Sequence, residues 1–194
     1  MNNSIQLKLI ATHLLAQREE NPARSNFPKE LVLDSTDDAI EVQKLMIYLN
    51  DQTVYGWKCM LPLDDGSIIL APLLHAPIKQ AENCPLYTTN NKALIEPEIA
   101  FILQSDLPSN KTYTNEDVDT AFASAHLALE LIQKRFDEGT PSTHIEKLAD
   151  GLSNQGVYLG PQIDKAKAYN ANTVNINVKQ TELELNLAGV HPAE

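Results

Sequence analysis

The stretch ALIEPEIAFIL, residues 93–103, decides how the chain is interpreted, because it is an apolar run interrupted by two acids and a proline. Alternate residues of a strand share a face, so Glu96 and Glu98 project together, followed on that face by Ala100. Acids beside an apolar surface need positive compensation, and two carboxylates at this spacing can hold one hard cation. A solvated edge strand, on which Pro97 and the acids discourage aggregation, explains the same spacing. Spacing alone leaves both interpretations open.

Two helices are predicted before this strand. Apolar residues recur mainly at helical spacing from Ile5 to Leu15, and after the polar run 17–20 the pair Asn21-Pro22 ends the helix. The segment DSTDD at 34–38 offers N-cap residues and early acids for a second helix, which we expect to run to about Asn50.

From Thr53 the sequence changes to short apolar runs broken by Gly, Pro and Asp, a pattern typical of strands. Besides 93–103, strands are predicted at Val54–Lys58, Ile68–Pro72, Val157–Leu159 and across 173–187.

One further helix is predicted within this strand-rich region. It begins with the capping-box pattern TNED at 114–117 and carries an apolar stripe through Val118, Phe122, Ala125 and Leu129. Beyond His126 the sequence fits either this helix or a buried strand. Helices first, then mostly strands around one helix, indicate the α+β class.

Composition excludes several classes of function. The chain has 26 acids against 15 Lys and Arg, a net charge of -11 that disfavours nucleic acid and anionic lipid surfaces as partners. The first twenty residues do not resemble a secretory signal, and no segment reaches about 18 apolar residues, so we expect a cytoplasmic protein that does not enter a membrane. The two cysteines lack CxxC spacing and are predicted to be plain thiols. GxSxG, GxGxxG and P-loop motifs are absent from the sequence.

Three other residues could carry chemistry, and each has a plainer interpretation. Glu130 is the only acid in the apolar window 127–132, where a buried acid would need a partner, although an exposed position on an amphipathic helix is the commoner case. Lys58 ends an apolar strand where a loop begins, but surface lysines are common. Asp150 precedes Gly151 near a turn, where a simple turn former is the commoner case.

Five blocks occur together in the order and approximate spacing of one family. They are VYGWKC (54–59), APL (71–73), IEPEIAF (95–101), LALEL (127–131) and ADGLSNQG (149–156). From about Asp38 to Gly160 the chain resembles the 2-keto-4-pentenoate hydratase and 2-oxohepta-3-ene-1,7-dioate hydratase group of the fumarylacetoacetase-like superfamily, which also contains 4-oxalocrotonate decarboxylase.

The resemblance implies a mixed β-roll core over residues 53–194, preceded by an N-terminal helical region over 1–52. It implies Mg²⁺ or Mn²⁺ held by three carboxylates, and by position these ligands are Glu96, Glu98 and Glu130. It also implies that Leu127–Arg135 is a strand, in favour of the buried alternative for Glu130.

The same resemblance implies a lyase that hydrates a 2-hydroxydienoic or 2-oxo-alkenoic acid, with the metal acting as a Lewis acid that stabilises an enolate. Lys58 and Asp150 are the predicted catalytic residues, Asp150 in a supporting role, and Trp57 and Lys58 are predicted to contact the substrate. Decarboxylation of a 2-oxo acid and hydrolysis of a carbon–carbon bond are alternatives within the superfamily.

The chain departs from the family pattern in two places. Family members continue well past a segment like 187–192, whereas this sequence stops at Glu194. We therefore expect that some strands of the sheet and part of the pocket are absent. A truncated, non-catalytic homologue is therefore a third hypothesis. Residues 60–90 do not follow the pentenoate hydratases, which leaves the choice of substrate open. Assembly into a homo-oligomer is also expected.

Overall fold

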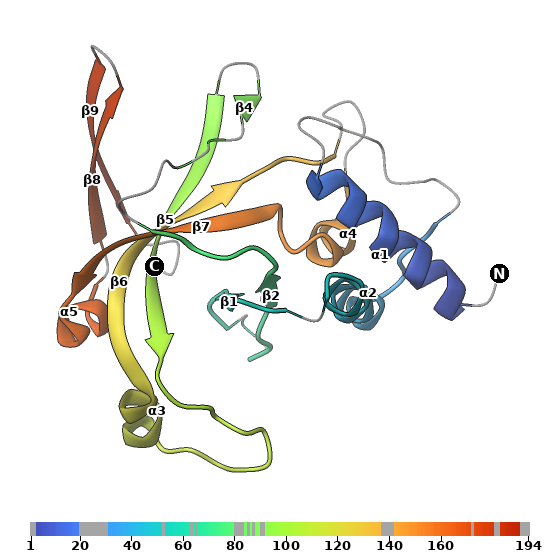
Figure 1. Ribbon diagram of the computed structural model, residues 1–194, viewed down its shortest axis with the longest axis horizontal. Coiled ribbons are helices and arrows are strands. Elements are labelled where there is room, and N and C mark those ends of the chain that lie inside the picture. The colour runs from blue at the N-terminus through green and yellow to red at the C-terminus, as the bar shows by residue number, and fades with distance from the viewer. Residues whose placement is uncertain are drawn as a thin grey trace. The chain divides into compact units, whose positions relative to one another are not determined.

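A computed structural model describes residues 3–19, 31–51, 53–62, 64, 66–79, 84, 86, 88–89, 92–136, 142–171, 173–180 and 183–190. Five helices and nine strands are assigned in these ranges (Figure 1). In chain order they are α1 (Asn3–Glu19), α2 (Thr36–Leu49), β1 (Gly56–Cys59), β2 (Leu70–Leu73), β3 (Ile78–Lys79), β4 (Thr88–Thr89), β5 (Lys92–Leu103), α3 (Asn115–Ala121), β6 (Phe122–Ile132), α4 (His144–Ala149), β7 (Asn154–Ile163), α5 (Lys165–Tyr169), β8 (Thr173–Gln180) and β9 (Leu183–Val190).

The chain divides into two compact units. The first comprises Met1–Pro77, Cys84–Ile95 and Leu131–Val157, and the second comprises Ile78–Asn83, Glu96–Glu130 and Tyr158–Glu194. The long strands β5, β6 and β7 each contribute residues to both units. The division at residue 52 that the sequence suggests stays a prediction.

Both N-terminal helices are confirmed. The second, α2, begins where the Ser35 side chain accepts a hydrogen bond from the Asp38 backbone N–H, with two acids in its first turn. This satisfies a backbone donor that the helix itself cannot pair, and the acids complement the helix dipole. The predicted end of the first helix at 21–22 lies outside the described residues.

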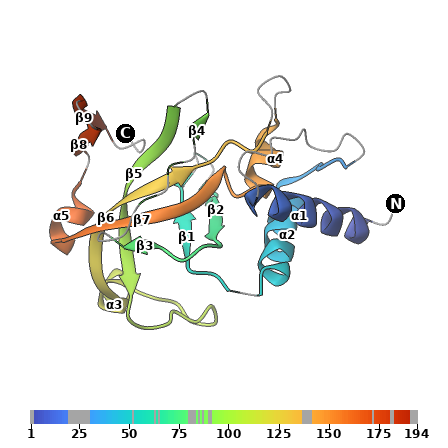
Figure 2. The same cartoon turned by 45° about the horizontal axis from the view of Figure 1, so that its top comes forward.

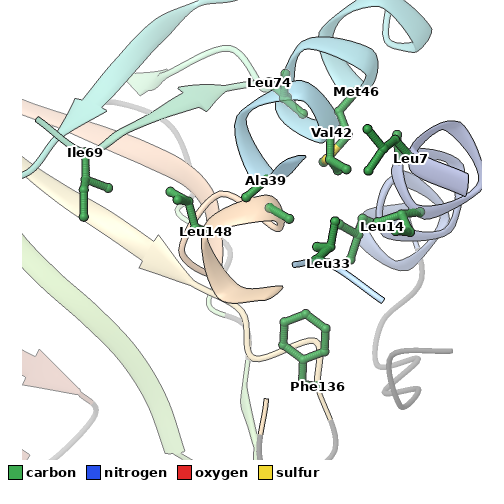
Figure 3. Packing of buried hydrophobic residues seen from close by; sticks show 13 residues of the cluster. Leu7, Leu14, Leu33, Ala39, Val42, Met46, Ile69, Leu74, Phe136 and Leu148 are labelled. Carbon is green, nitrogen blue, oxygen red and sulfur yellow. The ribbon is translucent and has the colours of Figure 1, made fainter. Parts of the chain in front are cut away.

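The hydrophobic core of the first unit forms between these helices and α4 (Figure 3). Leu14 of α1, Val42 and Met46 of α2 and Leu148 of α4 are buried to within 2 % of full burial. Each large apolar side chain removed from water contributes about 1.5–3 kcal/mol. Packing of apolar stripes therefore holds the helical region together.

The principal sheet has five strands in the order β3-β7-β6-β5-β4 (Figure 2). It is mixed, because β3 runs parallel to β7 while β4 runs antiparallel to β5. Two antiparallel hairpins stand outside it, β1–β2 and β8–β9. The α+β class is confirmed, and the segment 173–187 belongs to the second hairpin.

One predicted element is wrong in its boundary. The helix that begins at Thr114 has the expected capping box but ends at Ala121, and Phe122 already has the extended angles φ -89° and ψ 121°. Ala125 and Leu129 therefore belong to β6 and not to a helical stripe. Because β6 lies between β5 and β7, sheet pairing overrides the helix preference of its alanines and leucines. The strand expected over 127–135 is confirmed as far as Ile132.

Two expectations from composition can be compared with the structure. Neither Cys59 nor Cys84 takes part in a disulfide bond among the described residues. In the described ranges, none of the helices combines the length and the hydropathy that crossing a membrane requires.

Candidate metal centre

Three glutamates from two neighbouring strands meet in the second unit. Glu96 and Glu98 lie on β5 and Glu130 lies on β6, the next strand in the sheet. One carboxylate oxygen from each glutamate can be chosen so that all three lie within 4.8 Å of one another. The structure therefore brings together the three acids that the family resemblance singled out.

The three carboxylates differ in their contact with solvent. Glu96 is exposed, Glu98 is half-buried and only 1 % of Glu130 is exposed. Carboxylates at this separation repel one another, and burial of a charged carboxylate is costly unless it is compensated. A site that is open at Glu96 and closed at Glu130 leaves one side from which a ligand can enter.

The donor set suits a hard divalent cation. Oxygen ligands at about 2.1 Å from Mg²⁺ lie about 3 Å apart when adjacent and about 4 Å apart when opposite in an octahedron. An upper limit of 4.8 Å between the carboxylate oxygens is compatible with both arrangements after small side-chain adjustments. The residues thus fit Mg²⁺ or Mn²⁺, whose preferred protein ligands are carboxylates and water.

The predicted substrate-binding pair lies on the β1–β2 hairpin of the first unit. Lys58 is half-buried and is paired in the ladder with Ala71. Trp57, its neighbour, is 51 % exposed and lies opposite Pro72. Since neighbouring residues of a strand face opposite sides, Trp57 and Lys58 serve different surfaces of the hairpin.

Asp150 occupies the C-cap of α4 and its side chain is completely buried. Arg135 binds it through two parallel hydrogen bonds, Nε to Oδ1 at 2.7 Å and Nη2 to Oδ2 at 2.9 Å. Such a bidentate pair is strong and geometrically restrictive. In this arrangement the Asp150 carboxylate is engaged with protein, and it anchors the chain segment that follows α4.

A second buried arginine reaches the same segment from the N-terminal helix. Arg18 donates to the carbonyl oxygen of Asn154 at 2.7 Å and to the carbonyl oxygen of Asp150. Burial and, to a smaller extent, the positive charge of Arg135 lower the pKa of the Arg18 guanidinium, Asp150 opposes the shift, and the resulting pKa is about 9. The guanidinium therefore remains protonated at neutral pH.

The backbone between these two carbonyls is strained. Gly151, Leu152 and Ser153 have φ angles of 73°, 59° and 65°. A residue other than glycine in this left-handed region costs about 1–2 kcal/mol. The two arginines hold both ends of the turn, which explains how this conformation persists.

Sequence reasoning missed these arginines and their amide partner. Arg135 also donates to Gln155 Oε1 at 2.7 Å, and Gln155 Nε2 donates to the Arg18 carbonyl oxygen at 3.2 Å. The signal at Arg135 was weak, because Gln133 and Lys134 separate it from the apolar run that ends with β6 at Ile132. Arg18 stands in a polar run and gave no such signal.

The chain has an α+β fold that it shares with solved structures of an enzyme. In particular, it is similar to 4-oxalocrotonate decarboxylase from Pseudomonas putida G7, complexed with magnesium and adipate. The TM-score is 0.62 at 15 % identity, over 96 % of this chain and 74 % of the decarboxylase. A second structure of that enzyme, complexed with calcium and acetate, gives a TM-score of 0.60 at 16 % identity, over 96 % and 73 % of the two chains. No protein-family model and no curated protein matches the sequence. The resemblance inferred from the five blocks is confirmed at the level of the fold.

Proposed function

We propose that this protein is a divalent-metal-dependent lyase that acts on a small 2-oxo or 2-hydroxydienoic acid, with hydration of the conjugated double bond as its reaction. The observation that carries the proposal is the meeting of Glu96, Glu98 and Glu130, with oxygens within 4.8 Å, on a fold shared with a decarboxylase whose structure contains magnesium. The five sequence blocks support the hydratase assignment.

Each carboxylate has a distinct part in this proposal. Glu130, almost fully buried, would fix the inner side of the metal, and the more exposed Glu96 and Glu98 would complete a three-oxygen face. Bound Mg²⁺ or Mn²⁺ would supply Lewis-acid polarisation of the substrate's 2-oxo group. Three protein ligands leave coordination positions for the oxygens of a substrate, as catalytic metal sites require.

We assign supporting parts to Lys58 and Asp150, the two residues that the sequence predicts to be catalytic. Lys58, half-buried on one face of the hairpin, would orient the anionic substrate or transfer a proton. Trp57 faces the opposite side of the hairpin, so its predicted contact with the same substrate is not part of this proposal. Asp150 would act as a positioning residue, because Arg135 binds both of its oxygens and holds the turn that follows.

Decarboxylation is the second candidate, and both solved structures named above favour it because they are of a decarboxylase. The two reactions share a need to stabilise negative charge at the 2-oxo oxygen, and they differ in their products. Hydration consumes water and retains every carbon, whereas decarboxylation releases carbon dioxide.

The test has two parts. Titration calorimetry with Mg²⁺ and Mn²⁺ should show binding that Glu98→Ala abolishes and that Glu116→Ala, on the exposed start of α3, leaves unchanged. Loss of dienoate ultraviolet absorbance, with carbon dioxide measured in parallel, should then separate the two reactions. Metal binding without turnover of any dienoate or 2-oxo acid would refute the lyase proposal and favour a non-catalytic homologue. Absence of metal binding would refute both.

A further inference from the structure

A serine and a histidine form a hydrogen-bonded pair on β6, the strand that also carries Glu130. Ser124 Oγ lies 3.0 Å from His126 Nε2, and His126 Nδ1 lies 3.0 Å from the carbonyl oxygen of Gly160. All three residues belong to the second unit, and both side chains are half-buried.

The Gly160 carbonyl fixes the direction of these hydrogen bonds. A carbonyl oxygen only accepts, so Nδ1 of His126 carries the proton that binds it. In the neutral ring Nε2 is then an acceptor, and the Ser124 hydroxyl must donate to it. Ser124 thus supplies the hydroxyl, His126 is the base, and the Gly160 carbonyl oxygen orients the imidazole. A serine is activated as a nucleophile by an arrangement of this kind.

Gly160 permits the close approach that this arrangement needs. A Cβ at this position would lie 2.9 Å from the Leu127 carbonyl oxygen, which real side chains do not tolerate. The strands β6 and β7 can therefore come together here only with glycine, and the Gly160 carbonyl is held within reach of the imidazole.

An aromatic surface lies beside the hydroxyl. Phe122 and Ser124 occupy alternate positions of β6 and so share a face. The Phe122 ring centroid is 4.9 Å from that of Phe101, which stacks in turn on Tyr169 at 5.2 Å. A planar apolar group would pack favourably against this cluster.

We propose that Ser124 is a nucleophile activated by His126, and that the pair is a second reactive centre for small aryl esters. Ser124 Oγ attacks the acyl carbon and its proton passes to His126 Nε2. The bond between the acyl carbon and the aryl oxygen then breaks, and the leaving phenolate takes the proton from His126 Nε2. Water then hydrolyses the acyl-serine, so that one ester and one water give one acid and one phenol.

The experiment uses phenylmethanesulfonyl fluoride as the probe, with EDTA present so that no metal-dependent reaction contributes. Attack by Ser124 displaces fluoride, and peptide mass spectrometry of the wild-type protein should place the label on Ser124. His126→Gln should slow labelling about 100-fold, the usual contribution of a general base. Hydrolysis of p-nitrophenyl acetate should fall in parallel, and should vanish in Ser124→Ala.

Ser35 is the matched control, because its hydroxyl donates to the Asp38 carboxylate at the same 3.0 Å but lacks an imidazole. It should remain unlabelled, and Ser35→Ala should react like the wild type. Label on other serines, or an unchanged rate in His126→Gln, would overturn the proposal. If circular dichroism shows that Ser124→Ala does not fold, the position of the label in the wild-type protein and the labelling rate of His126→Gln still test the proposal. A Glu98→Ala variant that labels normally would show that this centre is independent of the proposed lyase.

Discussion

Replacement of Asp150 by alanine should destabilise the protein severely. Its carboxylate is fully buried and accepts two hydrogen bonds from Arg135, whose side chain is 1 % exposed. Arg18 Nη2 lies 3.9 Å from the same carboxylate. Removal of one partner from a buried ion pair costs about 3–5 kcal/mol, because an uncompensated charge is left in the interior. Here two guanidinium groups would lose their shared anion.

Urea denaturation, monitored by circular dichroism, measures the loss of unfolding free energy directly. Thermal unfolding measures the same loss as a lower melting temperature. For a chain of this size each kcal/mol lowers the melting temperature by about 2–4 °C, so we expect a decrease of roughly 6–20 °C. Glu41→Ala is the control, because its 3.2 Å pair with Lys44 is on the surface and should contribute less than about 1 kcal/mol. A loss below about 1 kcal/mol for Asp150→Ala would refute the anchoring role. An Asp150→Asn protein with normal stability and no activity would instead make Asp150 a catalytic group.

Three further predictions concern the second unit. Glu130→Gln should weaken Mg²⁺ binding at least tenfold by calorimetry, because it removes a carboxylate ligand. In thermal unfolding the stabilisation of about 2.7 kcal/mol that a ligand at 100 times its Kd gives should fall by at least about 1.3 kcal/mol, and an unchanged affinity would exclude Glu130 as a ligand. Gly160→Ala should destabilise by about 1–3 kcal/mol in urea, since its Cβ would meet the Leu127 carbonyl at 2.9 Å, and a neutral effect would contradict the close approach. Hydrogen bonds from Tyr169 and Lys165 lower the pKa of Asp119 below its usual 3.8. The ionised Asp119 carboxylate therefore stabilises the fold fully above pH 3.8, and this stabilisation is lost as the pH falls through the lower pKa of the folded protein. Carboxyl NMR should show titration below 3.8, moving back toward it in Tyr169→Phe.

The sequence was informative wherever the signal is local. Ser35 with two following acids identified the start of α2, and the alternation around Glu96 and Glu98 identified β5. These patterns depend on residues a few positions apart, and short-range periodicity reports them directly. The relation of Glu130 to that pair is different, because it depends on strand order. It could be expected only through a family resemblance.

Features that depend on distant partners were missed or misplaced. The residues after Ala121 favour helix by local preference, and only the neighbouring strands of the sheet make them β6. The ion pair between Arg135 and Asp150 joins residues that no periodic pattern connects. Arg18 lies further still from its acceptors, and nothing in its own neighbourhood distinguishes it from a surface arginine.

The hydrogen bonds from Arg18 to the two ends of the strained turn have a consequence for folding during synthesis. Arg18 and the carbonyl oxygen of Asn154 are 136 positions apart in the chain. The N-terminal helix therefore leaves the ribosome long before its acceptors exist, and closing so long a loop is entropically slow. Until then Arg135 alone holds the two ends of the left-handed segment 151–153. We expect α1 to be synthesised well before α4 and to be among the last elements to reach its final hydrogen bonds.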